Sequence, residues 1–122
     1  VINNIYNKKL IQDSKKAARY DISYEIKNFK KDNNFINKKC TWCKKLMKKN
    51  DKIHVDHIKP FIEIYSKFLK NNNLEYFETK NIGYSDKTIK NDNLKSKWIK
   101  YHKKYSKFQY LHSICNQQKG KK

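Results

Sequence analysis

The sequence predicts a small α+β fold, and three features support this prediction. Apolar residues recur at helical spacing in three segments, residues 13–30, 60–70 and 92–107. Two short segments, 53–58 and 108–111, have the composition of strands. Two pairs of soft metal ligands lie far apart in the chain, each pair with i, i+3 spacing. Because 122 residues suit one modest core, we expect metal binding to contribute to its stability.

The first predicted helix begins at Asp13 or Ser14, since either side chain can cap it, and it ends near Lys30. Residues 1–12 are polar and Asn-rich with no clear period, so no element is predicted there. The apolar stripe of the helix consists of Ile11, Ala18, Ile22, Ile26 and Phe29. We interpret this stripe as the face that packs on a core, and the alternative is a helix that reads DNA.

The middle of the chain predicts a strand followed by a helix. Residues 53–58 alternate apolar and polar side chains between turn signals. Pro60 suits the first turn of a helix, which Asn71–Asn73 ends. Residues 74–91 have no readable period, and we predict a long loop or insertion there.

The last third of the chain predicts a helix, a strand and a final short helix. The helix runs from Asp92 or Asn93 to about Lys107. Its apolar face is formed by Leu94, Trp98, Tyr101, Tyr105 and Phe108. The strand at 108–111 follows, and a short helix starts at Asn116.

The formal charge of +19 is extreme for a chain of this length, and Arg19 is the only arginine. A protein with so positive an electrostatic field binds polyanions and releases their counterions, so nucleic acid is the expected partner. An anionic membrane surface is the rival interpretation, and a compositional bias toward Lys, Asn, Ile and Tyr is a competing explanation for part of the lysine excess. No apolar run approaches the roughly 18 residues needed to cross a bilayer, so we predict no membrane partner.

The cysteine count and the lack of a signal peptide predict an intracellular, reducing environment. Three cysteines are an odd number, and two of them lie too close together for a useful disulfide. Cytoplasm, nucleus, organelle matrix and a virus-associated setting all meet this condition. The chain opens at Val1 without an initiator Met, which leaves open an upstream segment.

Four residues predict a structural zinc site: Cys40, Cys43, His112 and Cys115. Thiolate sulfur and imidazole nitrogen are the ligands that zinc prefers, and closed four-ligand sites are structural. The second pair repeats the i, i+3 spacing about 70 residues after the first, which strengthens the prediction. The alternative is that His112 is an ordinary strand residue and Cys115 a small buried hydrophobe.

The dipeptide Asp56-His57 carries a second kind of chemistry. Adjacent residues of a strand point to opposite faces, so we expect these two side chains to have different roles. A carboxylate suits Mg²⁺ or Mn²⁺, and an imidazole suits proton abstraction from water.

Three separated blocks resemble the HNH nuclease family: C-x-x-C, then V-D-H-I-x-P, then L-H-x-x-C-N-x-x-K-G. The resemblance covers roughly residues 38–122, which would be the HNH nuclease domain. It implies a small zinc-stabilised ββα-metal core with an inserted helix. Residues 1–37 lie outside it and would form an N-terminal helical extension that packs on the core.

The resemblance also implies residue roles. His57 matches the histidine that activates the attacking water, and Asp56 matches a metal-binding carboxylate. Asn116 matches the residue that opens the final helix and completes a Mg²⁺ or Mn²⁺ site. The family hydrolyses phosphodiester bonds to 5′-phosphate and 3′-hydroxyl ends.

The sequence departs from the family at one position. Lys107 stands where many members have an Asn that orients the catalytic histidine. We consider His102 as an accessory substitute, against the alternative of a surface or core histidine. The Gly-rich loop common after the Asp-His block is replaced by residues 60–91.

The expected function is therefore a metal-dependent DNA endonuclease or nickase that acts on double-stranded DNA. Lys59, Lys119 and Lys121 are the expected nucleic-acid contacts. The alternative is a non-catalytic HNH-fold module for DNA packaging or an RNA–protein assembly. The sequence leaves open whether the chain forms a homodimer.

Overall fold

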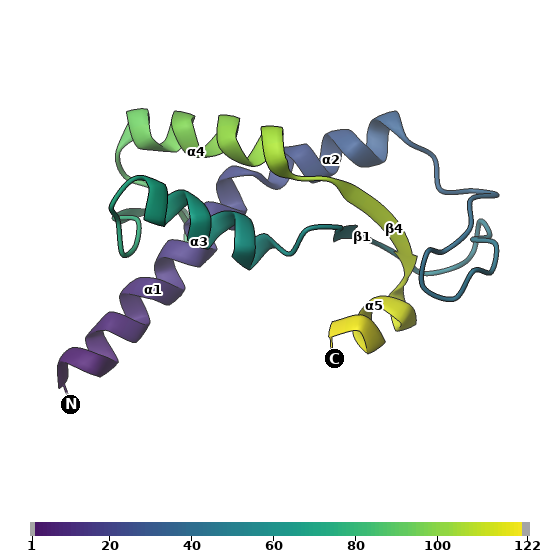
Figure 1. Ribbon diagram of the computed structural model, residues 1–122, viewed down its shortest axis with the longest axis horizontal. Coiled ribbons are helices and arrows are strands. Elements are labelled where there is room, and N and C mark those ends of the chain that lie inside the picture. The colour runs from purple at the N-terminus through teal and green to yellow at the C-terminus, as the bar shows by residue number, and fades with distance from the viewer. Residues whose placement is uncertain (1, 121–122) are drawn as a thin grey trace. The chain divides into compact units, whose positions relative to one another are not determined.

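A computed structural model describes residues 2–120 of the chain, and the side chains of residues 7–119. The fold is α+β, as predicted, with small antiparallel sheets (Figure 1). Its elements are α1 (Ile2–Asp21), α2 (Ser23–Asp32), β1 (Ile53–His57), α3 (Phe61–Asn71), β2 (Thr79–Ile82), β3 (Asp86–Ile89), α4 (Asp92–Tyr105), β4 (Phe108–His112) and α5 (Ser113–Gly120).

The described part of the chain forms two compact units. Unit 1 combines residues 1–25 with 60–106, and unit 2 combines residues 26–59 with 107–122. The boundary predicted at residue 37 lies inside unit 2. No described helix has both the length and the apolar character that crossing a membrane requires.

Unit 1 is built around a buried aromatic cluster. Trp98 of α4 is fully buried, and it contacts Phe61 and Phe68 of α3 as well as Phe77. The Trp98 indole donates a hydrogen bond to the carbonyl of Ala18 in α1, 3.0 Å away. Most of the apolar residues predicted for the second and third helices therefore belong to one core. Tyr105 is instead largely exposed, and Phe108, predicted on the face of the third helix, lies in β4 of unit 2.

Two buried polar residues of α1 hold other elements of unit 1. Ser14 Oγ lies 2.7 Å from the Tyr65 hydroxyl and accepts a hydrogen bond from the Phe77 amide at 2.8 Å. Asp21 accepts from Thr88 Oγ1 at 2.5 Å and from the amide of Ile89 at 2.9 Å. These contacts attach α1 to residues that lie more than 50 positions away in the sequence.

The prediction that the first helix begins at Asp13 or Ser14 is wrong, because α1 begins at Ile2. Ser14 is a mid-helix packing residue whose hydroxyl bonds to α3 and to residue 77, so it does not cap the helix. A turn at Ile22 separates α1 from α2, where the sequence predicts one continuous helix.

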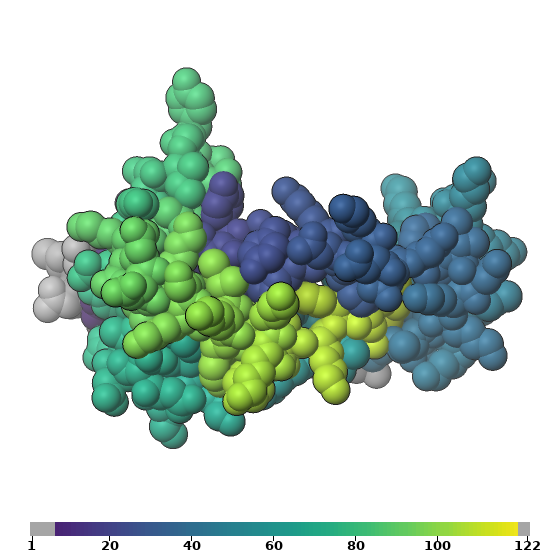
Figure 2. Space-filling model, turned by 90° about the horizontal axis from the view of Figure 1, so that it is seen from above, coloured from purple at the N-terminus to yellow at the C-terminus, as the bar shows by residue number. Residues whose placement is uncertain are grey.

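Residues 74–91, for which the sequence predicts a long loop or insertion, are not a loop throughout, because they contain β2 and β3. Strands β2 and β3 form an antiparallel hairpin with Thr79 opposite Ile89, and Gly83 takes a positive φ of 60° in its turn. This segment stands out from the surface in Figure 2 as a green projection, and Tyr84 at its tip is fully exposed. The hairpin is held by Asp21, a distant residue that no local period of the sequence indicates.

Unit 2 contains the predicted pair of strands. β1 and β4 are antiparallel, and their register places Asp56 opposite Gln109 and His57 opposite Phe108. Alternation puts Asp56 and Gln109 on one face of the two-stranded sheet and His57 and Phe108 on the other. The last helix, α5, follows β4 directly and begins at Ser113, three residues before the predicted start.

The core of unit 2 is small. It consists of Cys40, Met47, Tyr110, Leu111 and Cys115, with partly buried apolar neighbours around it. Phe29 from α2 contacts Phe108 and Tyr110, with ring centroids 5.6 and 4.9 Å apart. Two of the five core residues are thus cysteines of the predicted zinc set.

Candidate metal centre and strand site

The four predicted zinc ligands come together in unit 2. The ligand atoms of Cys40, Cys43, His112 and Cys115 all lie within 4.8 Å of one another. Neighbouring donors of a tetrahedral zinc site are about 3.5–3.8 Å apart, given Zn–S bonds of about 2.3 Å. The set of three thiols and one imidazole is therefore close enough to hold a metal such as zinc, as the sequence predicts.

A short hairpin forms the first half of this metal centre. Lys39 and Leu46 form an isolated bridge, and the amide of Cys40 donates to the carbonyl of Lys45 at 2.9 Å. Lys44 closes the turn, with a positive φ of 67° and its amide bonded to the carbonyl of Cys40. Cys40 and Cys43 thus lie on one tight turn, and the i, i+3 spacing brings both sulfurs to the same side.

The second half of the centre lies at the junction of β4 and α5. His112 is the last residue of β4, and Cys115 belongs to the first turn of α5. The imidazole Nδ1 of His112 lies 3.3 Å from Cys43 Sγ. Its Nε2 lies 3.1 Å from Oδ2 of Asp51, so Nδ1 is the nitrogen directed at the metal centre.

Asp51 is a partner of the metal centre that sequence reasoning missed. The carboxylate of Asp51 also accepts from the amide of Lys48 at 2.8 Å, which fixes the turn before β1. This amide bond is the main reason that the pKa of Asp51 is lowered, and the contact with His112 adds to it. A carboxylate on the outer nitrogen of a ligating histidine sets its tautomer and its orientation. No spacing rule connects Asp51 to His112, so only the fold could reveal the pair.

Without a bound metal, the thiols of Cys40 and Cys115 differ in acidity. Burial raises the pKa of Cys40, but backbone hydrogen bonds from Cys43, His112 and Trp42 outweigh burial and lower it to about 6. Burial raises the pKa of Cys115 to about 11, and hydrogen bonds and charge from Cys43 and Cys40 add to this shift. Burial lowers the pKa of His112, but its bonds to Cys40 and Cys43 raise it above the ordinary value. Metal binding therefore competes with a proton on Cys115 in particular.

The second predicted site lies on the face of the sheet that α5 covers. Lys119 of α5 forms an ion pair with Oδ2 of Asp56, and Gln109 Nε2 donates to the same oxygen at 2.9 Å. The side-chain amide nitrogen of Asn116, Nδ2, lies 3.3 Å from Nδ1 of His54. The structure thus brings α5 onto the His54 and Asp56 face of β1, and in these contacts Asp56 and Asn116 have different partners.

His57 occupies the opposite face, as the alternation of a strand requires. Its ring packs edge-on to Phe108, with centroids 4.9 Å apart, and it is partly exposed. It is also the last residue of β1, and the next amide, that of Ile58, bonds to the carbonyl of Lys107. Asp56 and His57 therefore have the different surroundings that the sequence predicts for them.

The remaining predicted site residues have varied positions. His102 belongs to unit 1, where its buried ring lies 2.9 Å from Glu25, and its accessory role stays a prediction. Lys59 is partly buried in unit 2. Lys119 forms the ion pair with Asp56 already described. Lys121 lies outside the described residues.

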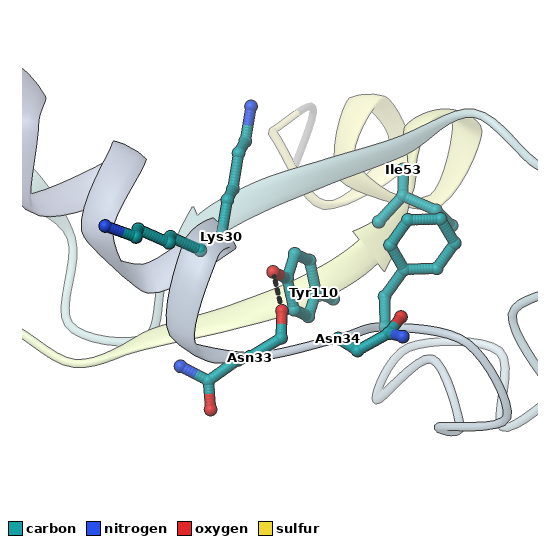
Figure 3. A pocket seen from close by; sticks show the side chains of 7 residues that line it. Lys30, Asn33, Asn34, Ile53 and Tyr110 are labelled. Atoms are coloured by element: carbon teal, nitrogen blue, oxygen red, sulfur yellow. Dashed lines mark hydrogen bonds between the residues drawn. The ribbon is translucent and has the colours of Figure 1, made fainter.

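A cavity of about 430 Å³ opens beside the His57 face of the sheet. Its lining residues are Lys30, Lys31, Asn33, Asn34, Phe35, Ile53 and Tyr110. Figure 3 shows the Tyr110 hydroxyl donating to the backbone carbonyl of Asn33, while Ile53 lies farther along the sheet and Lys30 extends outward. The cavity thus has an apolar floor on the sheet and a basic rim at the end of α2.

The positive charge is denser in unit 2 than in unit 1. Unit 2 contains fifteen basic and three acidic residues, a formal charge of +12 over 50 residues. Unit 1 contains fifteen basic and eight acidic residues, a formal charge of +7 over 72 residues. The unit that contains the metal centre and the Asp56 face therefore carries the stronger attraction for polyanions.

Comparisons of the chain with protein-family models, with curated proteins and with solved structures find no match.

Proposed function

We propose that this protein is a metal-dependent DNA endonuclease or nickase of the HNH type, with β1, β4 and α5 as its ββα-metal core. The observation that carries the proposal is the packing of α5 on the Asp56 face of β1, with Asn116 and Lys119 both in contact with that strand. The Cys3His set supports it as the candidate structural centre that joins the turn of Cys40 and Cys43 to the junction of β4 and α5.

Asp56 and Asn116 are the proposed ligands of Mg²⁺ or Mn²⁺. Carboxylate and amide oxygens are the donors that these hard cations prefer, and both residues belong to the same side of the sheet. A cation bound there would polarise the scissile phosphate and stabilise the leaving 3′ oxygen. Lys119, which forms an ion pair with Asp56, is the proposed contact to the phosphate backbone.

His57 is the proposed general base. His57 and Asp56 lie on opposite faces of the sheet, and His57 is the last residue of β1, so the proposal places the phosphodiester across the end of that strand. An imidazole takes a proton from water near neutral pH, and the products would carry 5′-phosphate and 3′-hydroxyl ends. The partly exposed ring of His57 leaves it accessible to such a substrate.

The test is cleavage of supercoiled plasmid with Mg²⁺ or Mn²⁺. We expect His57→Ala to reduce the rate by about 10²-fold or more, the usual scale for loss of an acid–base group. Asp56→Ala and Asn116→Ala should also lose activity, and high Mn²⁺ should restore part of it, whereas His57→Ala should stay slow. The neighbouring Ile58→Ala, at a half-exposed position, is the control for local packing. Equal rates for wild type and His57→Ala, or no cleavage with any divalent metal, would refute the nuclease.

A non-catalytic nucleic-acid-binding module is the second candidate, and the Lys119–Asp56 ion pair favours it because a paired carboxylate is partly neutralised. Both candidates require DNA binding that weakens steeply with salt, since the charge is nearly all lysine. We expect the logarithm of the binding constant to fall linearly with the logarithm of the salt concentration, with little dependence on sequence. Fluorescence anisotropy with two unrelated duplexes measures it, and a slope near zero would contradict both candidates.

A further inference from the structure

A chain of two hydrogen bonds connects the metal centre to Asp56 within unit 2. Thr41 lies between the two zinc ligands of the first turn, and its hydroxyl donates to Oε1 of Gln109 at 2.8 Å. Nε2 of Gln109 in turn donates to Oδ2 of Asp56 at 2.9 Å. The three residues come from a metal-binding turn and two different strands, and the closest pair in sequence is 15 positions apart (Thr41 and Asp56).

The chemistry of the Gln109 side-chain amide gives this pair of hydrogen bonds a direction. The Gln109 side chain has one end that accepts and one end that donates, and the two ends exchange when the amide flips. A flipped amide would place its oxygen against the Asp56 carboxylate, with two acceptors facing each other. The Asp56 carboxylate, which only accepts, therefore fixes which end of the amide faces it. The Thr41 hydroxyl, which can donate or accept, donates to the oxygen end and holds the Gln109 side chain in place.

The contacts on Asp56 are also selective. Gln109 and Lys119 both bind Oδ2, so Oδ1 is the carboxylate oxygen left for a cation. The side chain of Asp56 is only 17% exposed, which restricts its rotation further. A ligand carboxylate held by donors in this way loses little freedom when it binds a metal.

We propose that Thr41 and Gln109 are positioning residues that couple the zinc turn to the Asp56 carboxylate. Metal at the Cys3His set orders the turn that carries Thr41, Thr41 orients Gln109, and Gln109 holds Asp56 for the divalent cation. This inference rests on the proposed function for the identity of the Asp56 site, and it is tested by cation binding rather than by cleavage.

The experiment measures Mn²⁺ affinity of the zinc-loaded protein, without DNA, from the electron paramagnetic resonance signal of free Mn²⁺. The variants are Thr41→Val, which loses the hydroxyl at nearly constant shape, Thr41→Ser, which retains it, and Gln109→Leu. We expect about tenfold weaker Mn²⁺ binding for Thr41→Val and Gln109→Leu, the lower end of the range for loss of an outer-shell partner. Thr41→Ser should stay within about twofold of wild type, and the double variant Thr41→Val/Gln109→Leu should be no weaker than Gln109→Leu alone.

Controls separate this coupling from a general loss of structure. Zinc content is measured for every variant, and Gln118→Leu, at an exposed position of α5, controls for a new leucine in unit 2. If Thr41→Val loses zinc, the Mn²⁺ affinity of Gln109→Leu tests the coupling instead, because Gln109 lies outside the metal-binding turn. Unchanged Mn²⁺ affinity in Gln109→Leu, or additive losses in the double variant, would overturn the proposal.

The outcomes also distinguish this inference from the proposed function. One outcome is a protein that cuts no DNA and still binds Mn²⁺ in a way that depends on Asp56, Thr41 and Gln109. That result supports the coupling and refutes the proposed nuclease activity. Cleavage that survives unchanged in Thr41→Val and Gln109→Leu, with unchanged Mn²⁺ affinity, supports the nuclease and refutes the coupling. If wild type binds Mn²⁺ no better than Asp56→Ala does, the coupling has no cation site to act on and is refuted.

Discussion

The two units of this chain reach a folded state by different physical means. Unit 1 buries Trp98 and Phe77 almost completely among residues of α1, α3 and β3, so its stability comes from apolar burial and close packing. Unit 2 has a core of five residues, of which two are metal-binding cysteines, and an excess of twelve positive charges. A core this small offsets little of the entropy of folding, so we expect metal binding to supply the remainder.

The two units also differ in where their acidic residues lie and in what those residues contact. Eight of the eleven acidic residues belong to unit 1, where two of them, Asp21 and Glu25, are buried in contacts with α4 and β3. Unit 2 has only three acidic residues, and two of these, Asp51 and Asp56, contact the metal centre or the α5 face. Like charges repel and weaken a compact state, so we expect metal binding at the Cys3His set to offset part of this repulsion in unit 2.

Removal of a metal ligand should have the largest effect and should be confined to unit 2. We expect Cys115→Ser to lose tightly bound zinc and the structure of unit 2, because zinc binding supplies on the order of 10 kcal/mol in small zinc domains. Each unit has one tryptophan, so Trp98→Phe leaves Trp42 to report on unit 2, and Trp42→Phe leaves Trp98 to report on unit 1.

Chelation of zinc from these two single-tryptophan proteins provides the measurement. The emission of Trp42 should change, while that of Trp98 should remain blue-shifted as for a buried indole. Loss of both signals together would show that the units do not fold independently, and a folded, zinc-free wild type would refute the role of the metal.

Truncation of the unit 1 core should have the next largest effect. Trp98→Ala removes a side chain with no exposed surface and its bond to Ala18, so we expect a loss of about 3–5 kcal/mol in the free energy of unfolding. Urea unfolding of the zinc-loaded protein measures it, and zinc affinity should be unchanged within about twofold. Tyr84→Ala at the exposed hairpin tip is the matched control and should cost less than about 0.5 kcal/mol. A comparable loss in both variants would contradict the packing account.

Zinc affinity should rise with pH. The pKa of Cys115 is raised to about 11, so this thiol is protonated at pH 7–8 and must release its proton when metal binds. Cys40, with its pKa lowered to about 6, is largely a thiolate in that range and adds to the dependence only at lower pH. We expect at least about a tenfold gain in affinity per pH unit between pH 7 and 8, measured by competition with a chelator. A flat profile would contradict the release of a proton from Cys115 when metal binds.

The smallest expected effect concerns a buried hydroxyl of unit 1. Ser14→Ala removes a partner of Tyr65 and of the Phe77 amide, and a buried donor left without its acceptor costs about 1–3 kcal/mol. Ser96→Ala, at an exposed position of α4, is the matched control and should be nearly neutral. Thermal unfolding distinguishes them, and equal midpoints would show that the Ser14 contacts contribute no net stability.

Local sequence information was enough for the elements whose signal is periodic or chemical. The stripes of α3 and α4 predicted both helices, because a helix that packs on a core repeats its apolar residues at a fixed spacing. The paired i, i+3 ligands predicted the metal centre, because thiols and imidazoles at that spacing suit one ion. The opposite surroundings of Asp56 and His57 followed from strand alternation alone.

Tertiary structure decided everything that depends on residues distant in the sequence. Ser14 and Asp21 attach α1 to Tyr65, Phe77 and the β2–β3 hairpin, more than 50 positions away in the sequence. Asp51 and Gln109 became visible as partners of His112 and Asp56 only after the register of β1 and β4 placed them. The sequence by itself therefore indicated the four side chains that cluster as candidate metal ligands, since such a set is recognised by residue type and local spacing. The fold decided which residues hold the candidate site side chains in place, because their orientation depends on contacts that no local pattern records.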